Sequence, residues 1–242
     1  MAGREVRGNS APLPTRAPVT ASLPASQPAA NRARVSCSRP IRRGAGRRRR
    51  RRSNEHDRGD VRNGVDTEQL FGTLDAVKAD PSLARFQFRA RNRWIDGAHN
   101  QTRIRDFYAA NQEDTSRAED FVIDAGEPAI LLGTDTGPNP AEYLLHALAA
   151  CLTTSIVYVA AARKVELTSV ESTLTGDMDV RGALGVDDEP RNGFERITVS
   201  FRVTGNAPEE KLREVVERAQ KRSAVYDMVT NGVPVAVEVA TD

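Results

Sequence analysis

The sequence predicts an α+β fold in which pairs of antiparallel strands alternate with helices. Residues 141–164 contain neither Gly nor Pro and suit one long helix, whereas residues 170–180 and 197–203 alternate apolar and polar side chains with the period of a half-buried strand. These two strands follow one another without a helix between them, so strands come in adjacent antiparallel pairs. We expect two small antiparallel sheets around a long central helix.

The central helix is the longest apolar element of the chain. Pro140 suits its first position, and Gly137 and Pro138 hold the preceding loop. At about 1.5 Å per residue the helix is roughly 36 Å long, which is enough to cross a small domain. It is apolar on nearly every side over residues 147–162, which predicts that it lies inside the folded protein.

A membrane-spanning helix is the alternative interpretation of this segment. Such a helix needs about 20 predominantly apolar residues. Here Glu142, His146 and the polar residues 153–155 interrupt the apolar run, and amphipathic or acidic segments follow it. We therefore predict a buried helix in a soluble protein, with no membrane partner.

The first 60 residues differ in charge from the rest of the chain. The whole chain carries a formal net charge of +2, with 35 Lys and Arg against 33 Asp and Glu. Residues 1–60 hold 15 Arg and 4 acids, which leaves 20 basic residues against 29 acids, a net charge of −9, for residues 61–242. The chain thus joins a basic leader to an acidic body. Its 2 cysteines, Cys37 and Cys151, cannot build a disulfide framework and fit a reducing cytosol.

Residues 1–60 predict a disordered leader, because Arg, Pro, Ala and Ser dominate and no hydrophobic period is present. The unbroken arginines at 47–52 would suit a tether to nucleic acid or another anionic surface. We favour a leader without such a role, or translation begun upstream, since GC-rich codons encode these residue types by default. Nucleic acid is therefore not an expected partner. The leader lacks the apolar run of a secretory signal, whereas an organelle transit peptide stays open.

Residues 61–82 predict an amphipathic helical extension. The main domain follows it, and we place this domain at residues 83–242. Asp66 suits the N-cap, and Ala79-Asp80-Pro81 ends the helix. One apolar stripe runs along it, made of Leu70, Phe71, Leu74 and Val77.

A first sheet is predicted after this extension. Residues 85–94 alternate as a strand whose buried face carries Phe86, Phe88 and Trp94, and Asp96-Gly97 favours a hairpin turn. The other strands of this sheet are expected at residues 101–108, 121–123 and 129–132.

A second helix is predicted after the pair of strands at 170–180 and 197–203. Pro208 and two following glutamates open it. Its inward stripe consists of Leu212, Val215, Val216 and Ala219. A short segment at 223–230 then leads to a final strand at 233–239.

Two stretches of the sequence resemble the OsmC/Ohr family of organic-hydroperoxide reductases and their uncharacterised relatives. They are GTDTGPNPAEYLLHALAACLTTSI at 133–156 and RSAVYDMVTNGVPVAVEV at 222–239, and the hairpin FRARNRWIDGAHNQT at 88–102 is similar as well. The resemblance covers roughly residues 84–240. It implies an OsmC-like fold and an intertwined homodimer, in which strands of one subunit complete the sheet of the other and two active sites lie at the interface.

The resemblance also implies a reactive thiol. In the peroxidase members, a Cys on the central helix attacks the peroxide O–O bond, and a second Cys resolves the resulting sulfenic acid as a disulfide. Cys151 matches the first position, whereas Ser223 stands where those members carry the second. This implies a divergent member whose sulfenic acid needs an external thiol reductant. An inert buried thiol is the alternative for Cys151.

An Arg and a Glu orient the thiolate in those family members. Their Glu lies ten residues before the Cys, which is Ala141 in this sequence, and Glu142 one residue later is the candidate carboxylate. At about 100° per residue, Glu142 lies about 180° around the helix from Cys151, so we do not expect it to reach the sulfur directly. The hairpin offers four candidates for the Arg, namely Arg91, Arg93, Arg103 and Arg105.

Two histidines are candidates for a metal site with Cys151. His146 lies about 140° around the helix from Cys151, and His99 lies in the hairpin; neither CxxC nor HxxxH spacing is present. We therefore expect neither a metal nor a cofactor.

Two functions compete on these grounds. The first is a cytoplasmic, peroxiredoxin-like thiol peroxidase of the oxidative stress response, which reduces organic hydroperoxides at Cys151. The second is a non-enzymatic OsmC-like relative that binds a small apolar ligand at the dimer interface, with Cys151 in the lining. Both require a second copy of the chain as partner.

Overall fold

The computed structural model of the protein describes residues 60–241. The predicted leader at 1–60, apart from Asp60, and the cysteine within it lie outside the described residues. The elements are β1 (Val61–Arg62), β2 (Val65–Asp66), α1 (Thr67–Ala79), η1 (Pro81–Ala84), β3 (Arg91–Asp96), β4 (His99–Ile104), β5 (Phe107–Ala109), β6 (Gln112–Asp114), β7 (Phe121–Ala125), η2 (Ala129–Leu131), α2 (Pro140–Ala162), β8 (Leu167–Asp177), α3 (Val180–Ala183), β9 (Arg196–Gly205), α4 (Glu209–Gln220) and α5 (Ala224–Asn231).

All paired strands of the described chain are antiparallel, which confirms the predicted α+β class. The sheets are β1-β2, β3-β4-β7, β5-β6 and β8-β9, so the strands form more and smaller sheets than the two expected. The longest ladder joins β8 to β9, where Leu174 lies opposite Val199 and Ser172 opposite Phe201. The predicted alternation is visible in this ladder, since every second side chain of β9 is half-buried.

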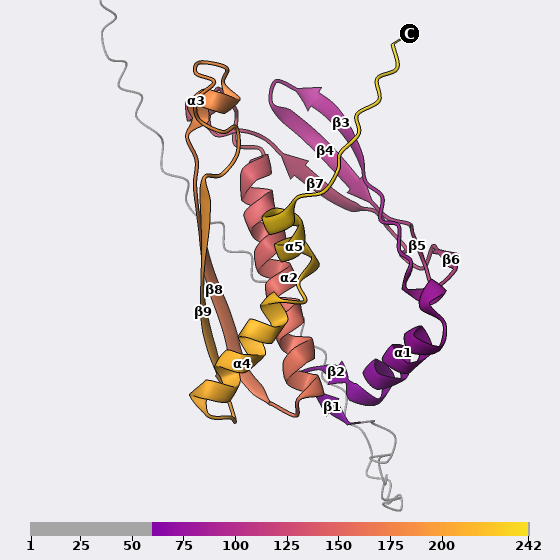
Figure 1. The fold of residues 1–242 in the computed structure, drawn as a ribbon. Helices are drawn as coiled ribbons and strands as arrows, with labels where there is room; N and C mark the ends of the chain where they lie inside the picture. The colour runs from indigo at the N-terminus through magenta and orange to yellow at the C-terminus, as the bar shows by residue number, and fades with distance from the viewer. Residues whose placement is uncertain (1–59, 242) are drawn as a thin grey trace, which may run out of the picture. The chain divides into compact units, whose positions relative to one another are not determined.

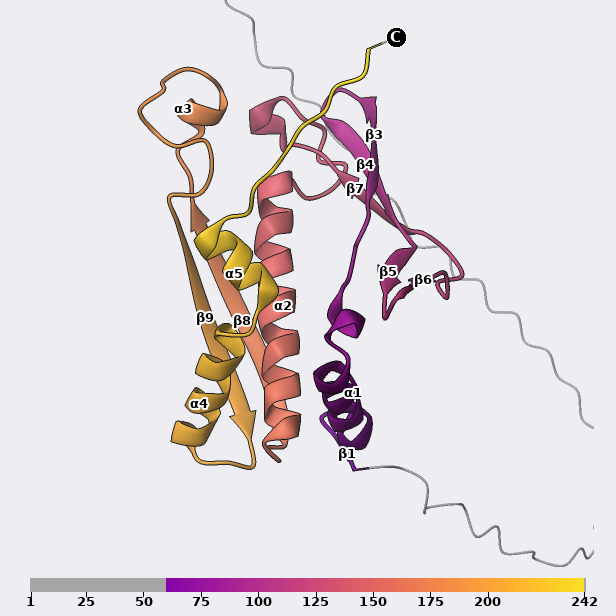
Figure 2. The ribbon, with the colours of Figure 1, turned by 45° about the vertical axis from the view of Figure 1, so that its right-hand side comes forward.

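The core lies between α2, the inner face of β8-β9 and α4 (Figures 1 and 2). Ile156, Ala160, Val165 and Val215 are wholly shielded from solvent. The predicted inward stripe of α4 is confirmed, because Leu212, Val215 and Ala219 are its buried residues. Burying a Val, Leu or Ile side chain in this layer contributes roughly 1.5–3 kcal/mol.

The central helix begins where the sequence predicts. Asn139 is its N-cap and accepts a hydrogen bond from the backbone N–H of Glu142 at 2.8 Å, while the Glu142 carboxylate accepts one from the N–H of Asn139 at 2.9 Å. This reciprocal capping box satisfies two N–H groups that the first turn leaves without partners. The phenol of Tyr143 donates to the backbone oxygen of Asp124 at 2.6 Å and thereby ties the start of α2 to β7.

The central helix is buried along one side only. Leu148, Leu152, Ile156, Ala160 and Ala161 are its buried residues, whereas others on it are exposed, among them Tyr158. The prediction of an all-round buried helix is therefore wrong for a single chain, because the described chain supplies layers against one side. By length and composition alone α2 could cross a membrane, a test that the core helix of a soluble protein also passes.

One asparagine hydrogen-bonds the helical extension to the main domain. Asp66 caps α1 as predicted, accepting from the N–H of Gln69 at 2.9 Å. In the turn before it, the amide of Asn63 donates to the backbone oxygen of Val165 and accepts from the N–H of Leu167, both at 2.8 Å. Asn63 thus joins the N-terminal hairpin to the segment that starts β8. The boundary proposed at residue 83 stays a prediction.

The first sheet differs from its prediction at both ends of the hairpin. Gly97 makes the predicted turn with a positive φ of 52°, but only Arg91–Asp96 of the expected strand 85–94 pairs as β3. Its apolar residues are not buried: Phe88 and Trp94 are both 71% exposed. The expectation fails because nothing in the described chain forms a second layer over this face.

The returning strand, expected at 101–108, is divided. It pairs as β4 with β3 and β7, then continues as β5, which pairs with β6 in another sheet. The apolar run expected as a strand at 129–132 is instead the 3-10 turn η2, closed by Leu132 at a φ of 64°, a conformation that no strand accommodates.

Two further expectations about strands are corrected after the central helix. Val180 belongs to the short helix α3 and not to the end of a strand, because Asp179 caps that turn by accepting from the N–H of Arg181. The final strand expected at 233–239 is unpaired in the described chain, and Val235, Val237 and Val239 are each more than 80% exposed. A strand needs a neighbouring ladder, and the described chain offers none to this segment.

Candidate functional site

The predicted thiol lies halfway along α2. Cys151 is half-buried, and among the described residues it is the only cysteine. Ala149 and Ala150 precede it, so the backbone of neighbouring elements can approach the sulfur closely. The neighbour on one side is α5, which packs against α2 near this point (Figure 2).

Ser223 faces the sulfur from the start of α5. Its hydroxyl donates a hydrogen bond to Cys151 Sγ over 3.1 Å, and its side chain is almost fully buried, with 2% of the residue exposed. The sequence places 72 residues between these two positions, and the resemblance implied that they face each other. The structure brings them together as implied.

The hydroxyl of Ser223 is oriented by its role as a helix cap. The backbone N–H of Tyr226 donates to Ser223 Oγ at 3.3 Å, which is the usual N-cap contact. Because one lone pair of the oxygen receives this N–H, the hydroxyl hydrogen is free to point at the sulfur.

Glu142, the candidate carboxylate, lies at the beginning of the same helix. Nine residues of helix separate it from Cys151, which amounts to roughly 13 Å along the axis. Its carboxylate is engaged in the capping box with the N–H of Asn139. The structure therefore shows Glu142 in a helix-capping contact and shows no hydrogen bond between it and Cys151 within the described residues.

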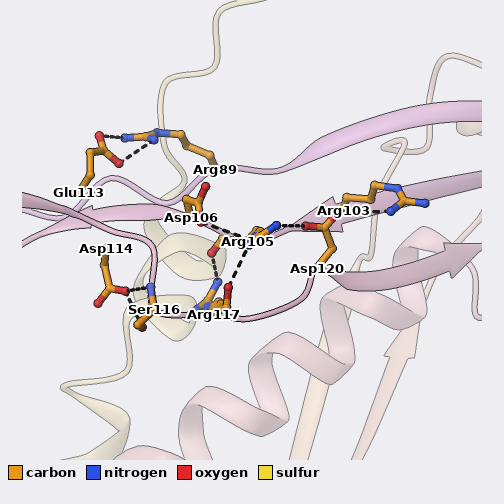
Figure 3. Close-up of polar contacts among 9 residues, drawn as sticks. All are labelled: Arg89, Arg103, Arg105, Asp106, Glu113, Asp114, Ser116, Arg117 and Asp120. Carbon is orange, nitrogen blue, oxygen red and sulfur yellow. Dashed lines mark hydrogen bonds and ion pairs between the residues drawn. The ribbon is translucent and has the colours of Figure 1, made fainter.

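Three of the four candidate arginines lie on β3 and β4, and Arg105 lies in the link between β4 and β5. Arg103 donates to Asp120 at 3.2 Å, and Arg105 lies 3.7 Å from Asp106 and donates to the backbone oxygen of Arg117 (Figure 3). Arg91 and Arg93 lie exposed on β3. Within the described part of the chain, none of the four forms a hydrogen bond with Cys151.

Neither histidine forms a contact with the thiol among the described residues: His99 pairs with Asp124, and His146 is exposed. His99 Nε2 lies 2.9 Å from Asp124 Oδ1, and Gln101 donates to the same oxygen at 3.1 Å. These contacts lower the pKa of Asp124 below its ordinary value of 3.8, with the hydrogen bond from His99 as the larger cause. His146 is exposed on α2. Among the described residues, no three metal-binding side chains gather.

One feature near the thiol was missed from the sequence. A hollow of about 400 Å³ lies between α2, β9, α4 and α5, and most of its wall is apolar. Its lining residues include Leu152, Ile156, Phe201 and Tyr226. Leu152 follows the cysteine, and Tyr226 is the residue whose N–H fixes Ser223, so the hollow adjoins the thiol site. The alternation of β9 signals an inner face, but only the packed structure shows that this face is incompletely filled.

The site thus consists of a cysteine halfway along a long helix and of the capped start of a second helix, which faces it. These features define a thiol-bearing α+β domain. Residues 133–238 match the family model described as OsmC-like protein. The chain therefore carries an OsmC-like domain over this range, which includes α2, the β8-β9 ladder and the Ser223 segment.

Several solved structures are similar to the chain. An OsmC like protein from Mycoplasma pneumoniae has 15% sequence identity and a TM-score of 0.46, with 64% of this chain and 96% of that chain covered. An organic hydroperoxide resistance protein OsmC from Legionella pneumophila has 18% identity and a TM-score of 0.41, covering 60% and 90%. The organic hydroperoxide resistance protein OhrB of Bacillus subtilis has 20% identity and a TM-score of 0.37, also covering 60% and 90%. The search of curated proteins returned no match.

Proposed function

We propose that the protein is a thiol-dependent peroxidase that reduces organic hydroperoxides at Cys151 with an external thiol as reductant. One observation carries this proposal: the hydroxyl of Ser223 donates to the Cys151 sulfur at 3.1 Å, from a buried and fixed position. A donor held against sulfur stabilises the thiolate, which is the nucleophilic form of cysteine. The OsmC-like match supports the same chemistry.

The proposed reaction proceeds in two stages. The Cys151 thiolate attacks one peroxide oxygen, the O–O bond breaks, and the other oxygen leaves with the alkyl group and takes up a proton as an alcohol. The sulfur is thereby oxidised to sulfenic acid and the hydroperoxide is reduced. An external thiol then forms a mixed disulfide with Cys151 and releases water, and a second external thiol restores the free cysteine.

Ser223 determines why the reductant must be external. Its oxygen cannot form a disulfide, so the sulfenic acid has no thiol partner among the described residues. In this proposal the hydroxyl remains as a hydrogen-bond donor throughout the cycle. The sulfenic acid should then persist, or oxidise further, until a thiol arrives from solution.

The proposed working form is a cytoplasmic homodimer. Large apolar side chains of the hairpin and of the final segment are exposed in the single chain, including Phe88, Trp94 and Val237. Exposed apolar surface marks an interaction site. A second copy of the chain would cover the apolar side chains of the hairpin and would pair with the final segment.

Turnover of tert-butyl hydroperoxide with a dithiol reductant tests the proposed activity. We expect turnover by the full chain, loss of turnover in Cys151→Ser, and normal turnover in Cys37→Ser, which controls for a contribution from the other cysteine. One equivalent of hydroperoxide without reductant should yield a sulfenic acid that dimedone traps at Cys151. Equal rates for wild type and Cys151→Ser would refute the proposal.

The substitution Ser223→Cys tests the geometry separately. Because Ser223 Oγ lies 3.1 Å from Cys151 Sγ, peroxide should produce a disulfide between Cys151 and the introduced thiol. This can be detected by mass spectrometry of peptides prepared without reductant. If dimedone still traps Cys151 but this disulfide does not form, the placement of residue 223 opposite Cys151 is wrong and the proposed function stands.

Ligand binding without turnover is the second candidate function. The apolar hollow of about 400 Å³ beside the thiol favours it, because that volume suits a small apolar molecule. If Cys151 reacts with hydroperoxide no faster than a free small-molecule thiol, this second function replaces the first.

A further inference from the structure

A second groove lies between α1, the last turns of α2 and the end of α4, and its lining on α2 begins at Ser155, one helical turn after Cys151. Its volume is about 470 Å³. The apolar part of its wall consists of Leu70 and Leu74 from α1 and of Tyr158, Val159 and Ala162 from α2. Leu74 and Tyr158 are 44% and 49% exposed, so this wall faces solvent in the single chain.

Three arginines line the same groove. Arg163 donates to Glu214 at 3.2 Å, whereas Arg218 and Arg222 form no ion pair with any described residue. Arg218 lies in the last turn of α4, and Arg222 follows one helical turn later. Both side chains line the same groove.

The surroundings of these arginines are basic in an otherwise acidic body. An adjoining hollow is lined by Arg163, Arg218, Lys221 and Arg222 together with two acids, Glu214 and Glu217. Four cations against two acids leave a local charge of +2, although residues 61–242 carry −9 overall. Interaction with the α4 dipole explains cations at a helix C-terminus, but it does not explain an open apolar trough beside them.

We propose that this groove binds a single-chain anionic amphiphile. A carboxylate or phosphate head would bind Arg218 and Arg222, and an alkyl tail would lie along Leu70, Leu74 and Val159. The guanidinium groups suit this head because they present paired N–H donors to planar or tetrahedral oxyanions. The volume lies in the range of sites that enclose small organic ligands, which excludes a two-chain lipid buried whole.

Calorimetric titration of the full chain distinguishes the head from the tail. Dodecanoate and dodecyl phosphate, each below its micelle concentration, should bind, and their ratio shows whether carboxylate or phosphate is preferred. Dodecanol lacks the charge and should bind at least about tenfold more weakly, and acetate or inorganic phosphate lacks the tail and should show no measurable binding. Equal affinity for dodecanol and dodecanoate would overturn the proposal.

Variants locate the site. The double variant Arg218→Gln/Arg222→Gln should weaken dodecanoate binding about tenfold or more, and Leu74→Glu should abolish it by placing a negative charge beside the tail. Arg213→Gln is the matched control, since Arg213 lies on the same helix but pairs with Glu209 at 2.7 Å, away from this groove. An equal loss in Arg213→Gln would show that general charge, not this groove, determines binding.

The same double variant tests the competing occupant, a second copy of the chain. Light scattering should give the same mass for Arg218→Gln/Arg222→Gln and for wild type. A drop in mass would show that the groove is a contact between copies, which also overturns the proposal.

Discussion

In the proposed function, the hydroxyl of Ser223 controls how readily Cys151 reacts. Ser223 both caps α5 and donates to the sulfur, so two effects must be separated when it is changed. Ala removes the cap and the donor together, Thr keeps both, and Asp keeps the cap but replaces the donor with a carboxylate. These three substitutions therefore distinguish a structural role from a chemical one.

The first prediction concerns these Ser223 variants. At pH 7, iodoacetamide should alkylate Cys151 about tenfold more slowly in Ser223→Ala than in wild type, because a hydrogen bond to a charged sulfur is lost. Ser223→Thr should retain the wild-type rate. Ser223→Asp should be at least as slow as Ser223→Ala although its helix cap is intact, because its negative charge opposes a thiolate. The rates are measured by mass spectrometry of the Cys151 peptide.

The control for this prediction is thermal stability. Loss of an N-cap costs about 1 kcal/mol, so Ser223→Ala should also lower the melting temperature, whereas Ser223→Asp tests reactivity with the cap kept. If Ser223→Asp alkylates as fast as wild type, the hydroxyl acts only as a cap.

At the scale of residues, the sequence was informative about Cys151 and Ser223 only through the resemblance to the OsmC/Ohr family, which paired the two positions. It was not informative about Asp124, whose contacts come from two separate elements: His99 and Gln101 on β4 and Tyr143 on α2. No spacing along the chain signals such a convergence.

Among the elements, β7 is tied to the start of α2 through Asp124. The pKa of the Asp124 carboxyl is lowered in the folded state. The stability that this carboxyl contributes is therefore fully present above the unfolded pKa of about 3.8 and is lost as the pH falls through the lower folded pKa. We predict that the stability difference between wild type and Asp124→Asn shrinks as the pH falls below about 3.8.

Urea unfolding at a series of pH values measures this difference. Asp96→Asn is the matched control, because Asp96 lies in the same sheet and its side chain forms no hydrogen bond with a described residue. A difference that grows as the pH falls would contradict the prediction.

Helix α1 depends on the turn that precedes it. Asn63 makes two hydrogen bonds across more than 100 residues and adopts a φ of 53°, which Asn tolerates better than Ala. We predict that Asn63→Ala releases α1, with amide hydrogen exchange in residues 67–79 accelerated about tenfold or more. Asn63→Gly separates the two causes, since Gly keeps the backbone conformation and loses only the side chain. Unchanged exchange in both variants would show that α1 is held by other contacts.

The predicted elements differ in how well the sequence determined them. Helices α1, α2 and α4 were found because caps, proline and one apolar stripe act within each segment. The strand expected at 85–94 formed only from Arg91 onwards, and the one at 233–239 did not form, because a strand exists only where another segment pairs with it. Their alternation is real, yet in the described chain their apolar side chains remain exposed.

For the whole molecule, this exposure leads to a prediction about assembly. We expect the full chain to be a dimer at micromolar concentration in light scattering, and removal of residues 233–242 to reduce the mass to that of a monomer and to destabilise the fold. The reason is that the segment with Val235, Val237 and Val239, which we expect to pair with the second copy, is then missing. A stable, folded monomer of the full chain would contradict this expectation.

The valine-rich segment also has a consequence for solubility. Short runs of alternating β-branched residues are the usual starting points of amyloid. An unpaired strand of this kind can pair with the exposed strand of another molecule and so start aggregation. Two residues within the segment oppose this: Pro234 has no N–H to donate to a ladder, and Glu238 brings a charge that repels its own copy in register. These two gatekeeper residues keep the segment from aggregating before it pairs with the second subunit. Their replacement should therefore appear first as fibrils in storage, well before any change in the chemistry of the sulfur.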